Sequence, residues 1–142
     1  MLIMIITTLL VLTGIISFKD KVITADKLPA TAGSFIDRFF HEATVSNVKK
    51  DSEFFKTHYK VFLQDGTEIE FNSKGEWEKV DGKRGTIPAG LIPAAVSEYV
   101  QSSFPGQNIV TIHKEKYGYK IELANELGLK FDKNGKLFSV DG

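Results

Sequence analysis

Two patterns of apolar and polar residues alternate along the chain, and each pattern occurs twice. Apolar residues at helical spacing follow Leu28-Pro29 and again Ile92-Pro93, which predicts a short amphipathic helix with proline in its first turn at each place. Behind each helix, apolar and polar residues alternate in short runs, as at 59–63 and 119–123. Turn residues separate these runs, so each helix is expected to precede four short antiparallel strands.

The two blocks also align with each other. Sliding the chain by 64 residues lays 28–51 over 92–115, and beyond residue 56 a shift of 60 continues the match. Residues Ser52–Phe55 are therefore extra in the first block. We interpret the chain as a tandem duplication, because one small insertion in an otherwise continuous match is hard to produce by chance.

One helix and four strands are marginal as an isolated unit, because one helix covers too little of one sheet face. Two such units side by side predict an α+β fold with an eight-stranded antiparallel sheet and both helices on one face. The first repeat is 28–82, a linker spans 83–91, and the second repeat is 92–142. The other sheet face is expected to meet water or a partner.

The turns after the second strands are expected to differ between the repeats. Asp65-Gly66 is typical of a tight hairpin turn. Asn125-Glu126 stands at the corresponding place in the second repeat and predicts a wider turn. The extra residues lengthen one hairpin and are expected to place Phe54-Phe55 near its tip, where they either contact a partner or fold back over the sheet edge.

The N-terminus differs in composition from the rest of the chain. Residues 1–17 carry no charged side chain and are rich in Ile, Leu, Val and Met, which predicts a signal peptide cleaved after Ser17. A retained membrane anchor is the alternative. Residues 18–27 are then an N-terminal lead-in. Either reading predicts export to the periplasm or outside the cell. The signal-peptide reading also predicts no membrane association once that peptide is removed.

The composition argues against nucleic acid as a partner and against sites that depend on cysteine or on a metal. The chain of 142 residues has 18 basic and 18 acidic residues, so no net positive field favours nucleic acid. It has no cysteine, which excludes disulfides, thiolate zinc sites and cysteine nucleophiles. His41, His58 and His113 fall on different elements without ligand spacing, so no metal or other cofactor is predicted.

Two acidic motifs are candidate sites. The "DKNG" run at 132–135 places glycine too early for a calcium-binding loop and is interpreted as a hairpin turn. Glu68 and Glu70 share one strand face, and a hydrolase using them as an acid/base pair is a third functional possibility. A solvated polar face explains the pair more simply, so no enzyme is predicted.

The repeats differ in where their aromatic residues lie. Phe62 occupies the polar-face position that Glu122 fills in the second repeat, whereas Phe138 stands where the first repeat has Glu78, with Trp77 beside it. Aromatic residues on a polar sheet face bury large area at low entropic cost, as a binding patch requires. The alternative is that Phe62 and Phe138 fill the seam between the repeats or a homodimer contact. The predicted protein-binding residues are Phe62, Trp77 and Phe138, surrounded by Lys60, Glu68, Glu70, Lys120, Glu122 and Lys130.

The elements "LPATAGSFIDRFF", "IPAAVSEYV", "YKV…DGTEIEFNSKGEW" and "YKIEL…LKFDKNGKL" resemble the PepSY-like family of small exported bacterial proteins over about residues 26–142. The resemblance implies a fold similar to that of the secreted β-lactamase inhibitor protein, and a periplasmic or surface location typical of Bacteroides and its relatives. It implies protein binding by analogy only.

The function predicted on these grounds is a non-catalytic periplasmic or secreted module that binds an exported or envelope protein through the open sheet face. Inhibition of an exported enzyme is one form that this role could take. The alternative is a binder of a small ligand, peptide or envelope component in the concavity of the sheet.

Overall fold

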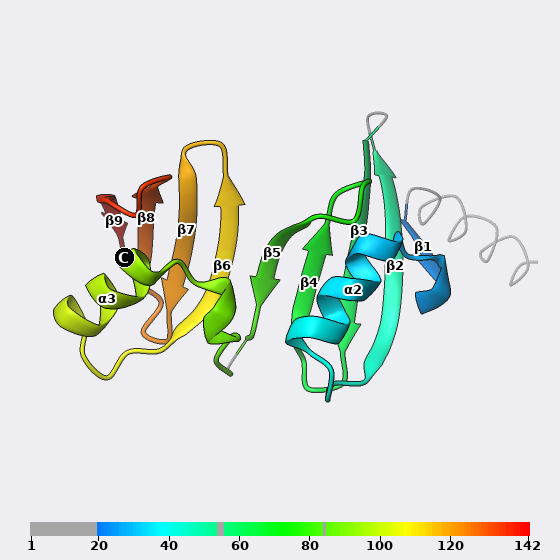
Figure 1. Ribbon diagram of the computed structural model, residues 1–142, viewed down its shortest axis with the longest axis horizontal. Coiled ribbons are helices and arrows are strands. Elements are labelled where there is room, and N and C mark those ends of the chain that lie inside the picture. The colour runs from blue at the N-terminus through cyan, green and yellow to red at the C-terminus, as the bar shows by residue number, and fades with distance from the viewer. Residues whose placement is uncertain (1–19, 54–55, 84) are drawn as a thin grey trace, which may run out of the picture.

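The computed structural model describes residues 20–53, 56–83 and 85–142. Within these ranges the chain forms one antiparallel sheet of nine strands, and each strand pairs with the next along the sequence. Both α-helices lie on the same side of this sheet (Figure 1). The predicted α+β class, single antiparallel sheet and one-sided placement of the helices are confirmed.

The elements follow one another in a simple order. The strands are β1 (Asp20–Ile23), β2 (Val45–Glu53), β3 (Lys56–Leu63), β4 (Glu68–Phe71), β5 (Trp77–Asp81), β6 (Ile109–Glu115), β7 (Gly118–Leu123), β8 (Gly128–Asp132) and β9 (Leu137–Asp141). The helices are α2 (Ala30–Phe39) and α3 (Ala94–Ser103), each preceded by a 3-10 turn, η2 (Ala25–Lys27) or η3 (Ala89–Leu91).

The sheet has nine strands rather than the eight that were predicted. The additional strand is β1, which lies in the segment 18–27 that was predicted as an N-terminal lead-in with no strand assigned to it. It pairs antiparallel with β2 over four residue pairs, from Asp20↔Asp51 to Ile23↔Val48. An unpaired β2 would expose its backbone donors and acceptors, and β1 satisfies part of that edge.

The helices cover the sheet with the faces that their apolar spacing predicted. Both start directly after a proline, at Pro29 and Pro93. The helices and one sheet face enclose a single apolar core. Its fully or nearly fully buried members include Ala32, Phe35, Ile36, Val48, Val61, Leu63, Ile69, Phe71, Val80, Val96, Val100, Ile112, Ile121, Leu123, Leu129 and Phe131.

The halves of the chain meet where β5 pairs with β6. This junction consists of three residue pairs, Lys79↔His113, Val80↔Ile112 and Asp81↔Thr111. Val80 and Ile112 are fully buried, so the apolar core continues without a break from one half to the other. The two halves therefore share one core.

The β2–β3 hairpin is longer than its counterpart. Strands β2 and β3 have 9 and 8 residues, against 7 and 6 in β6 and β7. The four extra residues thus lengthen this hairpin, as predicted. Phe54 and Phe55, predicted near its tip, lie outside the described residues, as does the predicted signal peptide at 1–17.

The prediction of a wider turn at Asn125-Glu126 is wrong. Gly66 N–H donates to Leu63 C=O at 3.1 Å, and Glu126 N–H donates to Leu123 C=O at 2.9 Å. Glu126 adopts φ +74° where Gly66 has φ +97°. The backbone therefore keeps the same turn in both halves and places a glutamate in the left-handed region that favours glycine.

None of the helices in the described part of the chain has the length and apolar composition needed to cross a bilayer.

Candidate functional site

The sheet face opposite the helices is open, and its composition follows from strand register. Residues paired across neighbouring antiparallel strands project from the same face, so the pairing defines rows of side chains that cross the sheet. Two such rows run the width of the open face.

The first row is dominated by cations, and we name it the lysine row. It contains five lysines, one histidine and one carboxylate. Its members, from β1 to β9, are Val22, Lys49, Lys60, Glu70, Lys79, His113, Lys120, Lys130 and Ser139.

The neighbouring row, displaced by two residues along the strands, carries the opposite charge, and we name it the acidic row. Four of its members are carboxylates and none is cationic. From β2 to β9 it contains Asn47, Phe62, Glu68, Asp81, Thr111, Glu122, Gly128 and Asp141.

A cation from the loop after β5 neutralises part of the acidic row. Lys83 Nζ lies 2.7 Å from Glu68 Oε2 and 3.4 Å from Asp81 Oδ2. The hydrogen bond to Glu68 raises the pKa of Lys83 above 10.5. Thr111 Oγ1 lies 3.4 Å from Asp81 Oδ1 across the junction of the halves. The acidic row therefore has internal partners near the middle of the sheet.

The lysine row is arranged differently. Among the ion pairs within the described ranges, none includes Lys60, Lys79, Lys120 or Lys130. Lys120 faces Lys130 directly, and Lys49 faces Lys60. Like charges directly opposite each other on adjacent strands destabilise a sheet.

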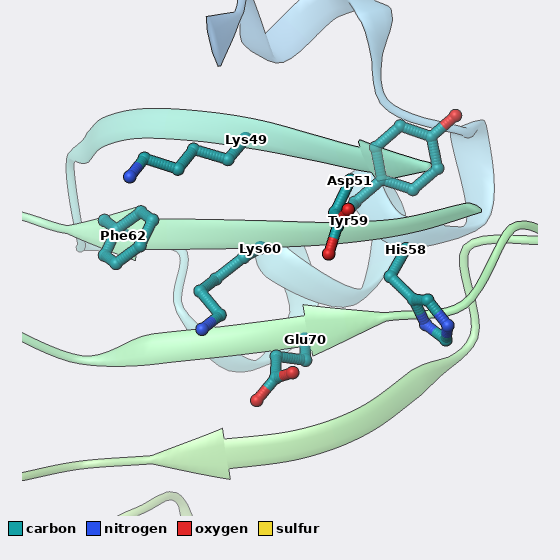
Figure 2. Close-up of a pocket in the computed structure, with 7 residues that line it drawn as sticks. All are labelled: Lys49, Asp51, His58, Tyr59, Lys60, Phe62 and Glu70. Atoms are coloured by element: carbon teal, nitrogen blue, oxygen red, sulfur yellow. The ribbon is translucent and has the colours of Figure 1, made fainter. Parts of the chain in front are cut away.

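Phe62 lies on the open face beside the lysine row, as its strand alternation predicted. It is half-buried and pairs with Glu68. The Lys49 Nζ atom lies 5.5 Å from the Phe62 ring centroid. Figure 2 shows these side chains with Lys60 and Glu70 on adjacent strands, around a hollow of about 170 Å³ that Asp51, His58 and Tyr59 also line.

Phe138 is the most exposed aromatic residue of the described chain, with 55% of its surface accessible. Its ring meets Tyr117 edge-on, with centroids 5.2 Å apart. Lys130 Nζ lies 5.9 Å from the Tyr117 ring centroid. Tyr117 comes from the β6–β7 turn and was missed in the sequence, because a turn residue has no place in strand alternation.

Trp77 does not belong to this surface, and its prediction as a member of the patch is wrong. Lys79 pairs with Glu70 on the open face, and strict alternation would put Trp77 on the same face. Instead the register shifts by one residue, and Trp77 pairs with buried Phe71. Its ring stacks on Phe35 of α2 at 5.9 Å, on the helix-covered side. A β-bulge reverses the direction of its side chain.

The other predicted residues fall into the two rows, but they do not form one patch. Lys60, Glu70, Lys120 and Lys130 belong to the lysine row, and Glu68 and Glu122 belong to the acidic row. Phe62 on β3 and Phe138 on β9 lie toward opposite ends of the sheet (Figure 1). Neither lies on β5 or β6, so the alternative that they fill the seam between the halves is wrong.

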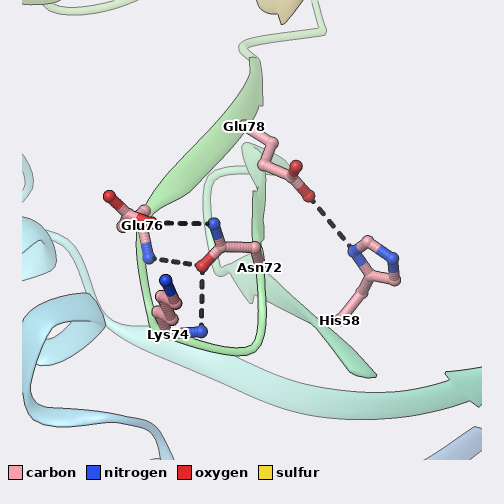
Figure 3. Close-up of polar contacts among 5 residues, drawn as sticks. All are labelled: His58, Asn72, Lys74, Glu76 and Glu78. Carbon is pink, nitrogen blue, oxygen red and sulfur yellow. Dashed lines mark hydrogen bonds and ion pairs between the residues drawn. The ribbon is translucent and has the colours of Figure 1, made fainter. Parts of the chain in front are cut away.

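The histidines form local pairs with carboxylates. His58 Nδ1 lies 3.1 Å from Glu78 Oε1 (Figure 3), and His113 Nδ1 lies 3.2 Å from Glu115 Oε1. No group of three His, Cys, Asp or Glu side chains suited to a metal ion occurs in the portion of the chain that the structure describes.

The "DKNG" run is a hairpin turn, as predicted. Asp132 Oδ1 accepts hydrogen bonds from the Asn134 and Lys136 N–H groups, both at 2.9 Å. Asn72 Oδ1 accepts equivalent bonds from Lys74 and Glu76 in the first half (Figure 3). These side chains cap the turn backbone.

Three solved structures from Bacteroides resemble this chain closely. The first, from Bacteroides thetaiotaomicron, is described as a "putative calcium-regulated periplasmic protein"; it is 34% identical with a TM-score of 0.85, over 89% of this chain and 99% of that one. A structure from Bacteroides vulgatus described as a "putative periplasmic protein of unknown function" is 36% identical with a TM-score of 0.83, over 87% of this chain and 99% of that one. Another from the same species is 31% identical with a TM-score of 0.82, over 87% and 98%.

No curated protein matches the chain. The family model described as "Putative beta-lactamase-inhibitor-like, PepSY-like" matches residues 57–139, which is more than half of the chain. The resemblance noted in the sequence is thereby confirmed, and the chain belongs to the PepSY-like family.

Proposed function

We propose that this protein is a non-catalytic, exported module that binds another protein through the open face of its sheet. The observation that carries the proposal is the one-sided cover: both helices lie on one face, and the other presents two long rows of charge with Phe62 and Phe138 among them. A sheet face that combines aromatic side chains with ordered charge has what a protein interface needs, namely apolar area and selectivity.

The comparisons support this proposal at the level of family and location. The family description is inhibitor-like, and the similar Bacteroides structures are described as periplasmic. A periplasmic or secreted location and inhibition of an exported enzyme are parts of the proposal.

The carboxylates on the open face favour binding over catalysis. Glu68 forms an ion pair with Lys83, and Glu70 stands between Lys60 and Lys79 in the lysine row. An acid/base pair needs one carboxyl group held protonated in an apolar environment. Cations surround both of these carboxylates instead, which favours a charged docking face.

A small-ligand site on the same face is the alternative. The hollow beside Phe62 has about 170 Å³, whereas sites for small molecules usually enclose about 300 to 1,000 Å³. A second hollow, of about 440 Å³, lies beside Asp81, Thr111 and Glu122 of the acidic row and is within that range. Four of its eight lining residues are charged, whereas small-molecule sites are lined mostly by apolar side chains, so the chemistry of the face favours a protein partner. A thermal-shift screen with peptides, glycans and lipids separates the two, since only the alternative predicts stabilisation by a small molecule.

The test is affinity capture from the native periplasmic fraction with matched variants. Phe62→Ala and Phe138→Ala should each reduce recovery of the bound protein. Val140→Ala is the control, because Val140 is 49% exposed on the same strand as Phe138 but pairs with buried Leu129 on the helix side. Equal recovery with all three variants would overturn the proposal.

We also infer that the halves arose by duplication, and the irregular positions of the sheet support this. Register shifts occur at Val45/Asn47 and at Ile109/Thr111, 64 residues apart. They occur again at Glu70/Phe71 and at Lys130/Phe131, 60 residues apart. These separations are the same two shifts that align the sequence.

A further inference from the structure

We propose that the lysine row binds an acidic segment of a protein partner that lies across the strands, with basic residues of the same partner facing the acidic row. This inference rests on the proposed function and names the chemistry of the partner.

The first argument is the continuity of the charge. From Lys49 on β2 to Lys130 on β8 the row crosses six strand spacings, or about 29 Å. Glu70 is the only carboxylate among the paired residues of the row between them. An extended peptide of about nine residues covers the same length, so one acidic segment can reach the whole row.

The second argument is the pairing of like charges. Lys49 faces Lys60, and Lys120 faces Lys130. Sheets gain stability when opposite charges face each other and lose it when like charges do. The two lysine pairs therefore lower the stability of the folded protein when no partner is bound. Carboxylates of a partner placed between the lysines would relieve this repulsion.

The third argument is the contrast between lysines in and outside the row. Lys83, outside the row, bonds to Glu68 and Asp81. Lys60, Lys79, Lys120 and Lys130 form no ion pair with any described residue. Lys60 and Lys79 share Glu70 as the one carboxylate opposite them, and Lys120 and Lys130 have no carboxylate opposite them in the row, so the row has more cations than carboxylates to offer an external anion.

The acidic row identifies the class of polyanion. It lies two residues along the strands from the lysine row, about 7 Å away, and carries Glu68, Asp81, Glu122 and Asp141. A broad anionic surface, such as a bilayer of acidic lipids, would place negative charge next to these carboxylates and be repelled by them. An anionic polysaccharide has no cations to offer them. A protein supplies both signs side by side, and Phe62 adds an apolar contact beside the lysines.

The experiment measures binding of a synthetic peptide of about twelve residues with alternating Glu and Ser to the full-length protein. The matched peptide replaces each Glu with Gln. We expect binding of the acidic peptide alone, weakening at least about tenfold as salt rises from about 0.05 M to about 0.5 M. Fluorescence anisotropy of the labelled peptides gives the dissociation constants.

Two variants with equal charge change locate the site. The row variant carries Lys60→Gln, Lys79→Gln, Lys120→Gln and Lys130→Gln. The control carries Lys27→Gln, Lys74→Gln, Lys133→Gln and Lys136→Gln, which change exposed lysines outside the row. We expect the row variant to bind the acidic peptide at least about tenfold more weakly and the control to change by less than about twofold. Thermal unfolding of both variants verifies that each is folded.

Equal losses in both variants would overturn the inference, because binding would then reflect net charge alone. It is also overturned if polygalacturonate or phosphatidylglycerol vesicles bind the row more tightly than the acidic peptide does. Native capture separates the two proposals. If the Phe62→Ala and Phe138→Ala variants lose the captured protein while the row variant retains it, the open face binds a partner and the acidic-segment inference fails.

Discussion

Lys120 on β7 lies directly opposite Lys130 on β8, on the same open face of the sheet. In the first half, Lys49 and Lys60 face each other in the same way on β2 and β3. Each half thus places two cations where an unconstrained sheet would alternate charge. Departures from the local rules of stability are expected at functional sites, and these lysine pairs are such a departure.

Replacing one member of the pair should therefore stabilise the protein. We expect Lys120→Gln to raise the free energy of unfolding by about 0.2 to 1 kcal/mol at low salt, because it removes repulsion from Lys130. Urea denaturation measures the change, and the gain should shrink at high salt because ions screen the pair. Lys133→Gln, in the exposed β8–β9 turn, is the control and should leave stability nearly unchanged. A lower free energy of unfolding for Lys120→Gln would show that repulsion between Lys120 and Lys130 does not destabilise the folded protein.

The two aromatic residues of the β5 and β9 bulges should respond very differently to truncation. Trp77 packs on Phe35 and the core, so we expect Trp77→Ala to lower the free energy of unfolding by about 2 to 4 kcal/mol. Phe138 contacts Tyr117 on the exposed face, and Phe138→Ala should change it by about 0.5 kcal/mol or less. Chemical denaturation of both variants checks this, and similar losses would contradict the opposite placement of the two side chains.

Glu126 adopts the left-handed backbone conformation that glycine occupies at Gly66. A residue with a Cβ atom is strained there, and glycine is not. We expect Glu126→Gly to stabilise the protein by up to about 1 kcal/mol, less the entropy that glycine adds to the unfolded chain.

The reciprocal change Gly66→Ala should destabilise the protein by a similar amount. No heavy atom lies within 4 Å of a Cβ built at Gly66, so the effect comes from the strained backbone conformation rather than from steric crowding. Thermal denaturation compares the two turn variants. A gain of stability for Glu126→Gly together with a loss for Gly66→Ala supports backbone strain at Glu126. A loss of stability in both variants would contradict it.

Lys114 links stability to alkaline pH. Its Nζ atom lies 4.2 Å from the Trp77 ring centroid, and burial lowers the pKa of Lys114 below 10.5 despite the attraction of Glu76 and Glu78. The unfolded chain thus binds the proton more strongly than the folded protein does. The contribution of Lys114 to the free energy of unfolding should therefore rise with pH, from its lowered pKa up to 10.5.

Lys114→Met should abolish that contribution. Denaturation of the wild type and the variant between about pH 8 and about pH 10.5 measures it as a difference that grows in favour of the wild type. The comparison with the variant is needed because the pKa values of Lys83 and Tyr117 are raised. These two groups lower the free energy of unfolding at the alkaline end in both proteins, opposite to the effect of Lys114. A difference that does not vary with pH would contradict the lowered pKa of Lys114.

Local rules predicted most of the fold. Proline at the helix starts, alternation at 59–63 and 119–123 and the turn at Asp132 all act within a few neighbouring residues, and each is found where it was expected. The strand β1 was missed because four residues carry too little periodicity, and its pairing with β2 depends on tertiary contact.

The candidate surface was predicted less well, because it depends on register. A one-residue bulge moves Trp77 to the covered face, and no residue near it signals the shift. Lys49, Lys79 and His113 were absent from the predicted surface, although each stands at an alternating position of its strand. Only the pairing of all nine strands shows that they form one row with Lys60, Lys120 and Lys130.

The narrow junction between β5 and β6 determines how this row acts as a unit. Three residue pairs join the halves, and one of them, Lys79↔His113, is itself a link in the row. Val80 and Ile112, which form the neighbouring pair, are fully buried and join the two halves in the same core. The lysines of both halves are therefore held in one continuous row, and a partner meets them as one surface rather than as two separate ones.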